Sequence, residues 1–596
     1  MKRLFYLILI TSLIFSQGKK YEGPDDPAGD IAAEREGYMT GNRVFLYFRN
    51  NTELSDWPKV NVSRWPNNLD GLKMTDGIGL LVGAKVYIKD DPTTNIDSTV
   101  VSDPIEIGDG EGLHKLYFLQ TSYREEMDLN PAGTFEYGFY PAFGYMNETS
   151  EYPAMSNRPS SWPINGWPST GTSTKWPGEW DGRFGRGVIY ADLETYFVAN
   201  DAQDQEYLEL PDRVRYYPRR NKTIGEMRDN ITIGKGNPWG GLGIRVEARG
   251  FQWNNPQARD AIFWEYNITN ISDYDLTEVA FGYWVDNAIG NDGIDELAYF
   301  DTYIDMSYSW DVNGIGQGGL PTGTMGFAYL ESPGMAYDDI DNDEDGILDE
   351  KRDNVATTKV GPTDGIYDVD KFLSFYKLDL ADLKEHWDAD EDQDWEDGDD
   401  ANNDGIYQIT EFFGDDIGLD GVAPTELNYT GPDEGEGNHK PDYVEGVGSE
   451  PNFAVTDVSE SDMMGLTAFR LFPVPSHAQS NTSWWFKNDE AMWALLGENI
   501  LEEYIEDISN LIEVFASGPF PLYKGRTERI SMSELHSYDP LEGLNSPAHT
   551  APALYELKKI VQVIYEKDYR FAQPPKMPTL TATPADGKVI LTWDNI

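Results

Sequence analysis

The feature that most constrains the fold is a strict alternation of apolar and polar residues in several segments. In "GIRVEARG", Ile244, Val246 and Ala248 alternate with charged residues, so an extended strand places the three on one face. "AIFWEYNITNIS" and "TEVAFGYWVDN" alternate in the same way, and turn-rich segments separate the runs. Helical periodicity is scarce in this part of the chain. We therefore predict that residues 38–330 are mainly β and form a large antiparallel β-sandwich, or two.

The last quarter of the chain contains both strand patterns and helix patterns. "LIEVFAS" and "TERISMSEL" predict strands, which we expect to complete the same sandwich. "NDEAMWALLGENILEEYIED" predicts a helix, and "TAPALYELKKIVQVIYEKDYR" predicts a second one, because its apolar residues recur at helical spacing. The mainly β fold therefore includes a few helices.

The first residues, "MKRLFYLILITSLIFSQGKK", have the organisation of a secretory signal peptide. Two basic residues precede an apolar run, and small residues follow it as a cleavage site. The run is too short to span a bilayer, and no later segment approaches about 18 consecutive apolar residues, so we predict no transmembrane segment. We expect residues 1–18 to be removed and the protein to be secreted, either extracellular or at the cell surface.

The composition excludes several classes of function. The absence of cysteine rules out thiol catalysis, zinc–thiolate sites and iron–sulfur clusters. With 104 acidic and 46 basic residues the net charge is -58, which repels phosphate backbones, so we expect no nucleic-acid partner. Neither H-E-x-x-H nor G-x-S-x-G occurs, and we identify no catalytic residue.

Residues 338–450 form an acidic insertion that contains a segment with the spacing of an EF-hand calcium loop. Such a loop needs oxygen ligands at positions 1, 3, 5 and 12, a glycine at position 6 and a backbone carbonyl at position 7. "DDANNDGIYQITE" meets these requirements, with Gly405 as the turn glycine, and "LDLADLKEHW" before it is a candidate helix. The predicted Ca²⁺ ligands are Asp400, Asn402, Asp404, the carbonyl of Ile406 and Glu411.

A second segment, "DIDNDEDGILDEKRD", carries the first half of the same pattern. Its position 12 is Arg352, which cannot be a ligand, so we expect Asp349 to close the shell. Short loops of this form occur in dockerin-like and thrombospondin type 3 repeats, which the segment resembles. Asp and Gly are also common in turns, so a solvated turn is the alternative for both segments. The predicted ligands here are Asp341, Asp343, Asp345 and Asp349.

Between the predicted strands lies a long segment, residues 152–185, that is rich in Pro, Gly, Ser and Thr. Trp162, Trp167 and Trp176 in this loop are each followed by proline. The rings either anchor the loop on the sandwich or form a platform on which sugar rings stack. Rings packed inward would favour the first interpretation, and exposed coplanar rings the second.

The last residues, 574–596, resemble the first two strands of a fibronectin type III module, because a Pro-rich linker precedes two strands joined by an Ala-Asp-Gly turn. "FGDDIGLDGVAPTELNYTGPDEGEGN", "SGPFPLYKGRTERISM" and "YEKDYRFAQPPKMPTLTATPADGKVILTW" resemble a family of uncharacterised large secreted proteins of Gram-negative bacteria. That resemblance implies β-sandwich regions, acidic calcium-type loops, trailing fibronectin type III modules and a surface location, with no catalytic residue assigned.

These features divide the chain into five predicted parts. They are the signal peptide (residues 1–18), a β-sandwich region (19–337), the acidic insertion (338–450), helices and strands that complete the sandwich (451–573), and a truncated fibronectin type III module (574–596). Two functions are compatible with them. The first is a secreted or cell-surface structural or adhesive protein stabilised by Ca²⁺, with other surface proteins as partners. The second is a protein that binds or degrades extracellular polysaccharide.

Overall fold

The computed structural model describes most of the chain, although residues 1–28, which include the predicted signal peptide, lie outside the described part. The described residues are 29–57, 59, 61–90, 98–100, 113–123, 138–168, 176, 191–201, 241–272, 274–291, 295–351, 354–426, 429–444, 448–453, 461–473, 489–502, 508–540, 542–544, 549–567, 569, 580–585 and 588–593.

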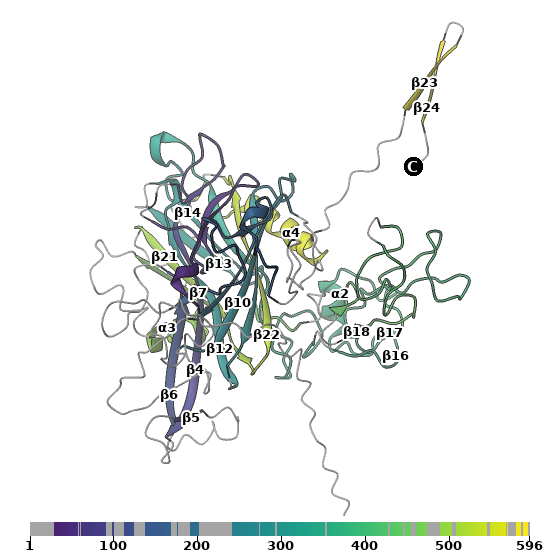
Figure 1. The fold of residues 1–596 in the computed structure, drawn as a ribbon, viewed down its shortest axis with the longest axis horizontal. Helices are drawn as coiled ribbons and strands as arrows, with labels where there is room; N and C mark the ends of the chain where they lie inside the picture. Colours follow the sequence, from purple (N-terminus) through teal and green to yellow (C-terminus); the bar gives the residue numbers. More distant parts are fainter. Residues whose placement is uncertain are drawn as a thin grey trace, which may run out of the picture.

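Two antiparallel sheets pack face to face in the body of the molecule (Figure 1), which confirms the mainly β prediction. The larger sheet has the strand order β13 (Glu296–Asp301), β14 (Met306–Asp311), β15 (Thr324–Glu331), β22 (Thr527–Ser537), β11 (Ala261–Asn270), β10 (Ile244–Gln252), β9 (Leu193–Asp201) and β7 (Phe139–Pro141), with β8 (Ala154–Met155) also paired to β9. The smaller has the order β20 (Ala468–Pro473), β21 (Leu511–Leu522), β12 (Leu276–Asn287), β4 (Thr75–Asp90) and β5 (Ser98–Val100), with β6 (Leu113–Thr121) also paired to β4.

The sandwich core lies between these two sheets and follows the alternation of the sequence. Ile244, Val246 and Ala248 of β10 are all fully buried and share one apolar cluster with Val82 of β4 and Phe281 of β12. Burial of such side chains contributes on the order of 1.5–3 kcal/mol each. The inward-facing positions of both sheets therefore supply the main hydrophobic stabilisation.

The outer faces are also covered, which alternation alone does not predict. Arg249 of β10 and Glu194 of β9 both have side chains without exposed surface, and they form an ion pair at 2.5 Å. Helix α4 (Pro552–Glu566) packs its apolar stripe on the outer face of the larger sheet, and α3 (Asp489–Gly497) packs on that of the smaller sheet. Some charged residues on the outer faces of the strands are therefore buried.

The two late strands lie in the two sheets of the sandwich, where they were expected. β21 pairs with β12 and β20 in the smaller sheet, and β22 lies between β15 and β11 in the larger one. The predicted helix at residues 488–507 is too long, because α3 ends at Gly497 and the backbone of Leu501 pairs with Phe469 instead. A Cβ at Gly497 would lie 2.8 Å from the Trp493 ring, so the last residue of the helix packs directly against this ring.

The remaining elements are short. A three-stranded sheet contains β1 (Glu36–Met39), β2 (Phe45–Arg49) and β3 (Ser63–Arg64), and single-turn 3₁₀ helices are η1 (Ile31–Ala33), η3 (Pro159–Ser161), η5 (Ile289–Asn291) and η6 (Gln317–Gly319). Near the C-terminus β23 (Leu580–Ala585) and β24 (Lys588–Trp593) form an antiparallel pair. None of the helices in the described residues is long and apolar enough to cross a membrane.

The acidic insertion leaves the sandwich after β15 and returns before β20, and it projects to one side of the sheets (Figure 1). It contains α2 (Val369–Phe375) and the paired strands β16 (Lys359–Val360) with β17 (His386–Trp387) and β18 (Tyr443–Val444) with β19 (Gly448–Ser449). The helix expected at "LDLADLKEHW" is absent, since this segment is a turn followed by β17, and α2 precedes it. The described remainder is turns, so little backbone pairing holds the insertion together.

One buried acid of the sandwich predicts a pH-dependent stability. The Glu513 carboxylate faces the gap between the sheets and accepts hydrogen bonds from Ser307 and Asn287. Burial raises the pKa of Glu513 to about 7 from its ordinary value of 4.5. The folded state thus favours the protonated acid, and stability falls as the pH rises from 4.5 through 7, by about 3 kcal/mol in total.

We expect Glu513→Gln to remove that loss, because glutamine stays neutral and can keep both hydrogen bonds. The free energy of unfolding of the variant should exceed that of the native chain by up to about 3 kcal/mol near pH 9, and the two should agree near pH 4. Denaturant titrations across this range measure the difference. Glu556→Gln, on the exposed face of α4, is the matched control. Its free energy of unfolding should follow that of the native chain at every pH. Parallel curves for the native chain and Glu513→Gln would contradict the expectation.

Candidate metal centre

The segment Asp341–Glu350 forms a tight acidic loop where the insertion begins. Carboxylate oxygens of Asp341, Asp343 and Asp345 lie within 4.8 Å of one another. The Asp341 carboxylate accepts a hydrogen bond from the Gly346 N–H at 3.2 Å, and that of Asp345 accepts one from the Ile347 N–H at 2.8 Å. These turns orient three of the four predicted acidic side chains toward one point.

Glu350, which the spacing rule did not select, lies beside this cluster without belonging to the group of oxygens within 4.8 Å of one another; burial, followed by Asp345 and Asp343, raises its pKa. Its side chain is 1% exposed, and among the described residues no donor contacts either of its carboxylate oxygens. The Oδ1 atoms of Asp341 and Asp343 are likewise buried and accept no hydrogen bond within the described chain. Because a buried carboxylate oxygen without a donor is costly, four such atoms in one loop indicate a ligand shell for a cation.

The electrostatics of the loop agree with this interpretation. Burial, followed by the neighbouring carboxylates, raises the pKa of Glu350 far above its usual range and has the same effect on Asp343. The compensating groups are few. Lys371 pairs with the other oxygen of Asp341 at 2.8 Å, and the Tyr376 hydroxyl donates to Asp345 at 2.6 Å. When all four acids are ionised, they carry a larger charge than Lys371 neutralises. A divalent cation would offset the remaining negative charge.

Helix α2 positions both of these partners. Asp368 caps the helix by accepting from the Lys371 N–H at 3.1 Å, and the helix packs Phe372 against Ile347 in a small apolar cluster. The loop and the helix are thus joined by packing as well as by charge. These contacts bring the acidic side chains close together, and a cation between them would offset the repulsion that remains.

The turn glycine of this loop provides a prediction with a matched control. Gly346 has a φ of 102°, and a Cβ there would lie 2.7 Å from both the Asp368 carbonyl oxygen and the Phe372 nitrogen. Gly405 in the other predicted loop also has a positive φ, of 75°, but a Cβ there would meet nothing within 4 Å. Gly346→Ala therefore combines backbone strain with a clash, whereas Gly405→Ala adds strain alone.

We expect Gly346→Ala to destabilise the insertion by more than about 2 kcal/mol and Gly405→Ala by about 1 kcal/mol. Pulse proteolysis in increasing urea, with cleavage sites mapped within residues 338–450, measures both. Equal effects of the two substitutions would show that the first loop does not pack against α2 as described.

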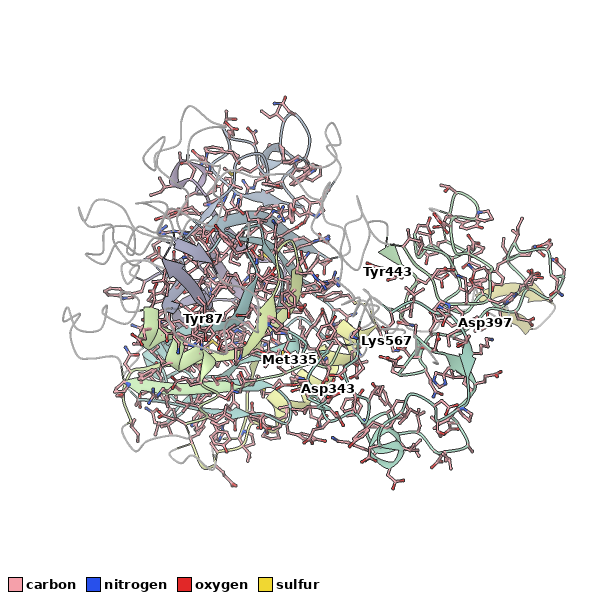
Figure 2. All side chains as sticks on the ribbon, turned by 90° about the horizontal axis from the view of Figure 1, so that it is seen from below. Tyr87, Met335, Asp343, Asp397, Tyr443 and Lys567 are labelled. Carbon is pink, nitrogen blue, oxygen red and sulfur yellow. The ribbon has the colours of Figure 1, made fainter. Side chains whose placement is uncertain are left out.

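Asp349 belongs to a different cluster at the base of the insertion. Its carboxylate accepts from the backbone N–H groups of Asp338 and Asp339 at 2.9 and 3.1 Å, and it gathers with Asp338 and Asp462 rather than with Asp341. Asp462 accepts from the Asn342 N–H at 2.6 Å, so it ties the start of the insertion to its end. Asp343, which Figure 2 labels, is close enough to this cluster that Asp462 contributes, after burial and Asp345, to its raised pKa. Asp349 therefore lies in a separate acidic group that could itself hold a cation, whereas Glu350 is the acid that interacts with Asp343 and Asp345.

The other predicted loop has the expected turn but not the expected convergence. The Asp400 carboxylate accepts from the Gly405 N–H at 2.7 Å, which lowers its pKa. The acidic side chains of Asp400, Asp404 and Glu411 do not gather as those of the first loop do. Instead the Gln408 amide donates to Asp404 and to the Ile406 carbonyl, and the Asn402 amide donates to Gln408 and, at 3.4 Å, to Glu411. Side-chain amides thus donate to the ligand atoms of three of the five predicted ligands, which are Asp404, the carbonyl of Ile406 and Glu411.

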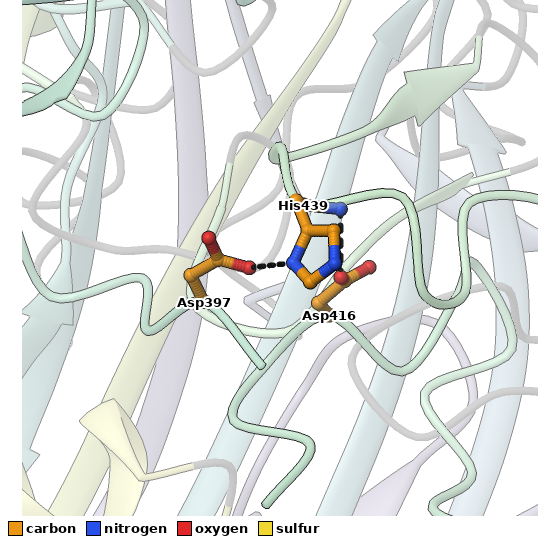
Figure 3. A group of neighbouring side chains, drawn as sticks. All are labelled: Asp397, Asp416 and His439. Carbon is orange, nitrogen blue, oxygen red and sulfur yellow. Dashed lines mark hydrogen bonds and ion pairs between the residues drawn. The ribbon is translucent and has the colours of Figure 1, made fainter. Parts of the chain in front are cut away.

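A third acidic group in the insertion consists of Asp397, Asp416 and His439 (Figure 3). His439 Nδ1 lies 3.0 Å from Asp397, which raises the pKa of His439. The Asp416 carboxylate is buried and already accepts from the Tyr407 hydroxyl at 2.6 Å and from the His439 N–H at 2.8 Å. These hydrogen bonds account for the burial of Asp416 without an ion. We therefore interpret the group as a hydrogen-bonded contact between segments of the insertion.

A fourth group consists of Asp390, Asp392 and Asp394, whose carboxylates also gather within 4.8 Å. It lies next to the first loop, because Asp392 and Asp345 both influence the Tyr376 hydroxyl and raise its pKa, after the effect of burial. The alternating acidic residues of "DADEDQD" could have indicated this group from the sequence alone. Glu350 was harder to identify, because it lies one position after the expected ligand. Asp462 could not be identified from the spacing, because it is distant in sequence.

Comparisons with known proteins add no assignment. No family model matches the chain, and no curated protein matches it. The inferences about function therefore rest on the acidic clusters and on the fold.

Proposed function

We propose that this chain is a secreted or cell-surface structural or adhesive protein in which a calcium ion orders the base of the acidic insertion. The observation that carries the proposal is the set of four buried carboxylate oxygens without donors, contributed by Asp341, Asp343 and Glu350. Asp345 and the backbone carbonyl of Ile347, at the seventh position of the loop, are further candidate ligands.

The chemistry of the donors favours Ca²⁺ over other ions. All the side-chain ligands are carboxylate oxygens, and Ca²⁺ takes six to eight hard oxygen ligands, often with one bidentate carboxylate. Glu350 offers two adjacent oxygens for that role. No cysteine occurs in the chain and no histidine belongs to this cluster, so ions that prefer sulfur or imidazole are disfavoured.

The alternative function, binding or cleavage of polysaccharide at the Trp-rich loop, loses its main support. Trp167 and Trp176 are 0% and 2% exposed. Trp167 packs on Tyr196, and the two tryptophan rings contact each other at an interplanar angle of 74°. The Trp162 indole donates to the Met155 carbonyl at 2.8 Å. These rings anchor the loop and present no coplanar stacking surface.

Removal of calcium tests the proposal. Extracellular calcium modules bind with dissociation constants of about 10⁻⁴–10⁻³ M, so millimolar Ca²⁺ would stabilise the whole chain by only about 0.4–1.4 kcal/mol per site. The local effect should be larger, because carboxylates in contact repel one another without the ion. We expect limited proteolysis in a chelator to cut within residues 338–450 while the sandwich remains resistant.

Identical fragments with and without chelator would contradict the proposed calcium role. The proposed export has its own test, which is the N-terminal sequence of the protein recovered from the medium or the cell surface. Processing near Gly18 is the expected result, and an intact N-terminus in the cytoplasm would contradict it. The fibronectin type III resemblance of residues 574–596 belongs to the same proposal, because such modules are typical of surface proteins.

A further inference from the structure

A surface pocket of about 470 Å³ lies beside the three-stranded sheet, remote in sequence from the acidic insertion. Its volume is within the range of small-molecule binding sites. Three aromatic side chains line it, and they come from β1, β2 and the segment before β8: Tyr38, Phe45 and Tyr152. Tyr38 faces outward on β1 between the buried Gly37 and Met39, and it is 40% exposed.

The aromatic side chains of this pocket are held in place from behind. The Tyr38 ring lies 5.7 Å from Phe45 and 5.6 Å from Tyr47, which fixes one face of it. The Arg158 guanidinium lies 3.7 Å from the centre of the Tyr152 ring. Rigid, partly exposed aromatic side chains lose little conformational entropy when a ligand packs on them.

The polar groups of the pocket are available to a ligand. Thr40, Asn61, Asn157 and Arg158 line it and are exposed, and their side chains make no hydrogen bond to any described residue. Asparagine amides and hydroxyl groups both donate and accept hydrogen bonds, as sugar hydroxyls do. Among the residues that the structure describes, no carboxylate lines the pocket, although the chain carries 104 acidic residues.

We propose that this pocket binds a short segment of a neutral glycan. The apolar faces of sugar rings would pack on Tyr38 and Tyr152, and their hydroxyls would bond to the amides of Asn61 and Asn157. The net charge of -58 disfavours polyanions such as nucleic acids and acidic polysaccharides, so the uncharged class fits best. The site is separate from the metal centre, and it uses Tyr152, Asn157 and Arg158 at the start of the Trp-rich segment rather than the buried rings of Trp167 and Trp176.

Isothermal titration of the purified chain tests the proposal, with a galacturonate hexasaccharide as the charged comparison and neutral hexasaccharides of glucose, mannose and N-acetylglucosamine as the candidate ligands. We expect one of them to bind with 1:1 stoichiometry, in calcium and in chelator alike. Tyr38→Ala should weaken that binding about tenfold or more, because the stacking surface is lost. Tyr303→Ala removes a tyrosine that is 93% exposed elsewhere on the surface, and it should leave binding unchanged.

Arg158→Ala provides a second variant in case Tyr38→Ala fails to fold, since the Arg158 side chain is exposed and forms no ion pair with a described residue. It should weaken binding through loss of the support for Tyr152. Failure of all the hexasaccharides to bind would overturn the proposal, as would binding that neither Tyr38→Ala nor Arg158→Ala reduces. Binding confined to uronate-containing oligosaccharides would overturn the assignment to a neutral glycan.

Discussion

Glu350→Gln should lower the affinity of the chain for Ca²⁺ by at least about tenfold, since it removes charge from the expected bidentate ligand. Both Glu350 oxygens are buried without donors next to Asp343 and Asp345. The substitution keeps the size of the side chain, so a change in affinity reports the lost charge rather than a cavity. Calorimetric titration of calcium into the chelator-treated chain measures the effect.

Asp349→Asn is the matched control for this substitution, because it neutralises the adjacent acid on the same loop. The Asp349 carboxylate accepts from two backbone N–H groups and lies in the neighbouring cluster. Asparagine can still accept through its carbonyl oxygen, so we expect less than about a threefold change in affinity. A larger loss from Asp349→Asn than from Glu350→Gln would favour the ligand set expected from loop spacing and contradict the proposed one, in which Glu350 is a ligand.

Trp167→Ala should destabilise the sandwich by about 3–5 kcal/mol, the usual cost of removing a fully buried tryptophan. Its ring is 0% exposed and lies 5.4 Å from Tyr196 of β9 and 5.8 Å from Trp176. The loss includes the transfer free energy of the ring and the cavity left against the outer face of the larger sheet. Guanidinium denaturation followed by circular dichroism measures it.

Trp57→Ala is the control, since this tryptophan is 49% exposed, and we expect it to cost no more than about 1 kcal/mol. If Trp167→Ala were as mild as Trp57→Ala, the Trp-rich loop would not be an anchor. The sugar-platform interpretation of this loop would then need to be reconsidered.

The strands were predictable because one physical rule governs them. Alternation places Ile244, Val246 and Ala248 on one face, and that face is the core. The burial of Arg249 against Glu194 was not predictable, because it depends on which distant segments cover the outer face of the sheet. The local alternation of apolar and polar residues predicts which face of a strand a residue occupies. It does not predict which distant segment packs on that face.

The acidic loops show a similar limit. Both sequences contain the Asp and Gly spacing of a calcium loop, and both form the expected turn. They differ in what lies nearby, since α2 supports the loop at Asp341 whereas the Gln408 amide engages the ligands of the loop at Asp400. The closer match to the EF-hand spacing is therefore the less convergent of the two. Which acidic side chains gather after the turn depends on the path of the chain, and that path places Asp349 with Asp338 and Asp462.

Hydrogen–deuterium exchange, read by mass spectrometry, tests most directly whether a cation orders the base of the insertion. The chain is compared in millimolar CaCl₂ and in chelator. We predict that calcium slows exchange of backbone amides in Asp341–Glu350, in α2 and around Asp462, while β10, β11 and β22 exchange equally in both conditions. Equal exchange of the Asp341–Glu350 amides in calcium and in chelator would contradict the account.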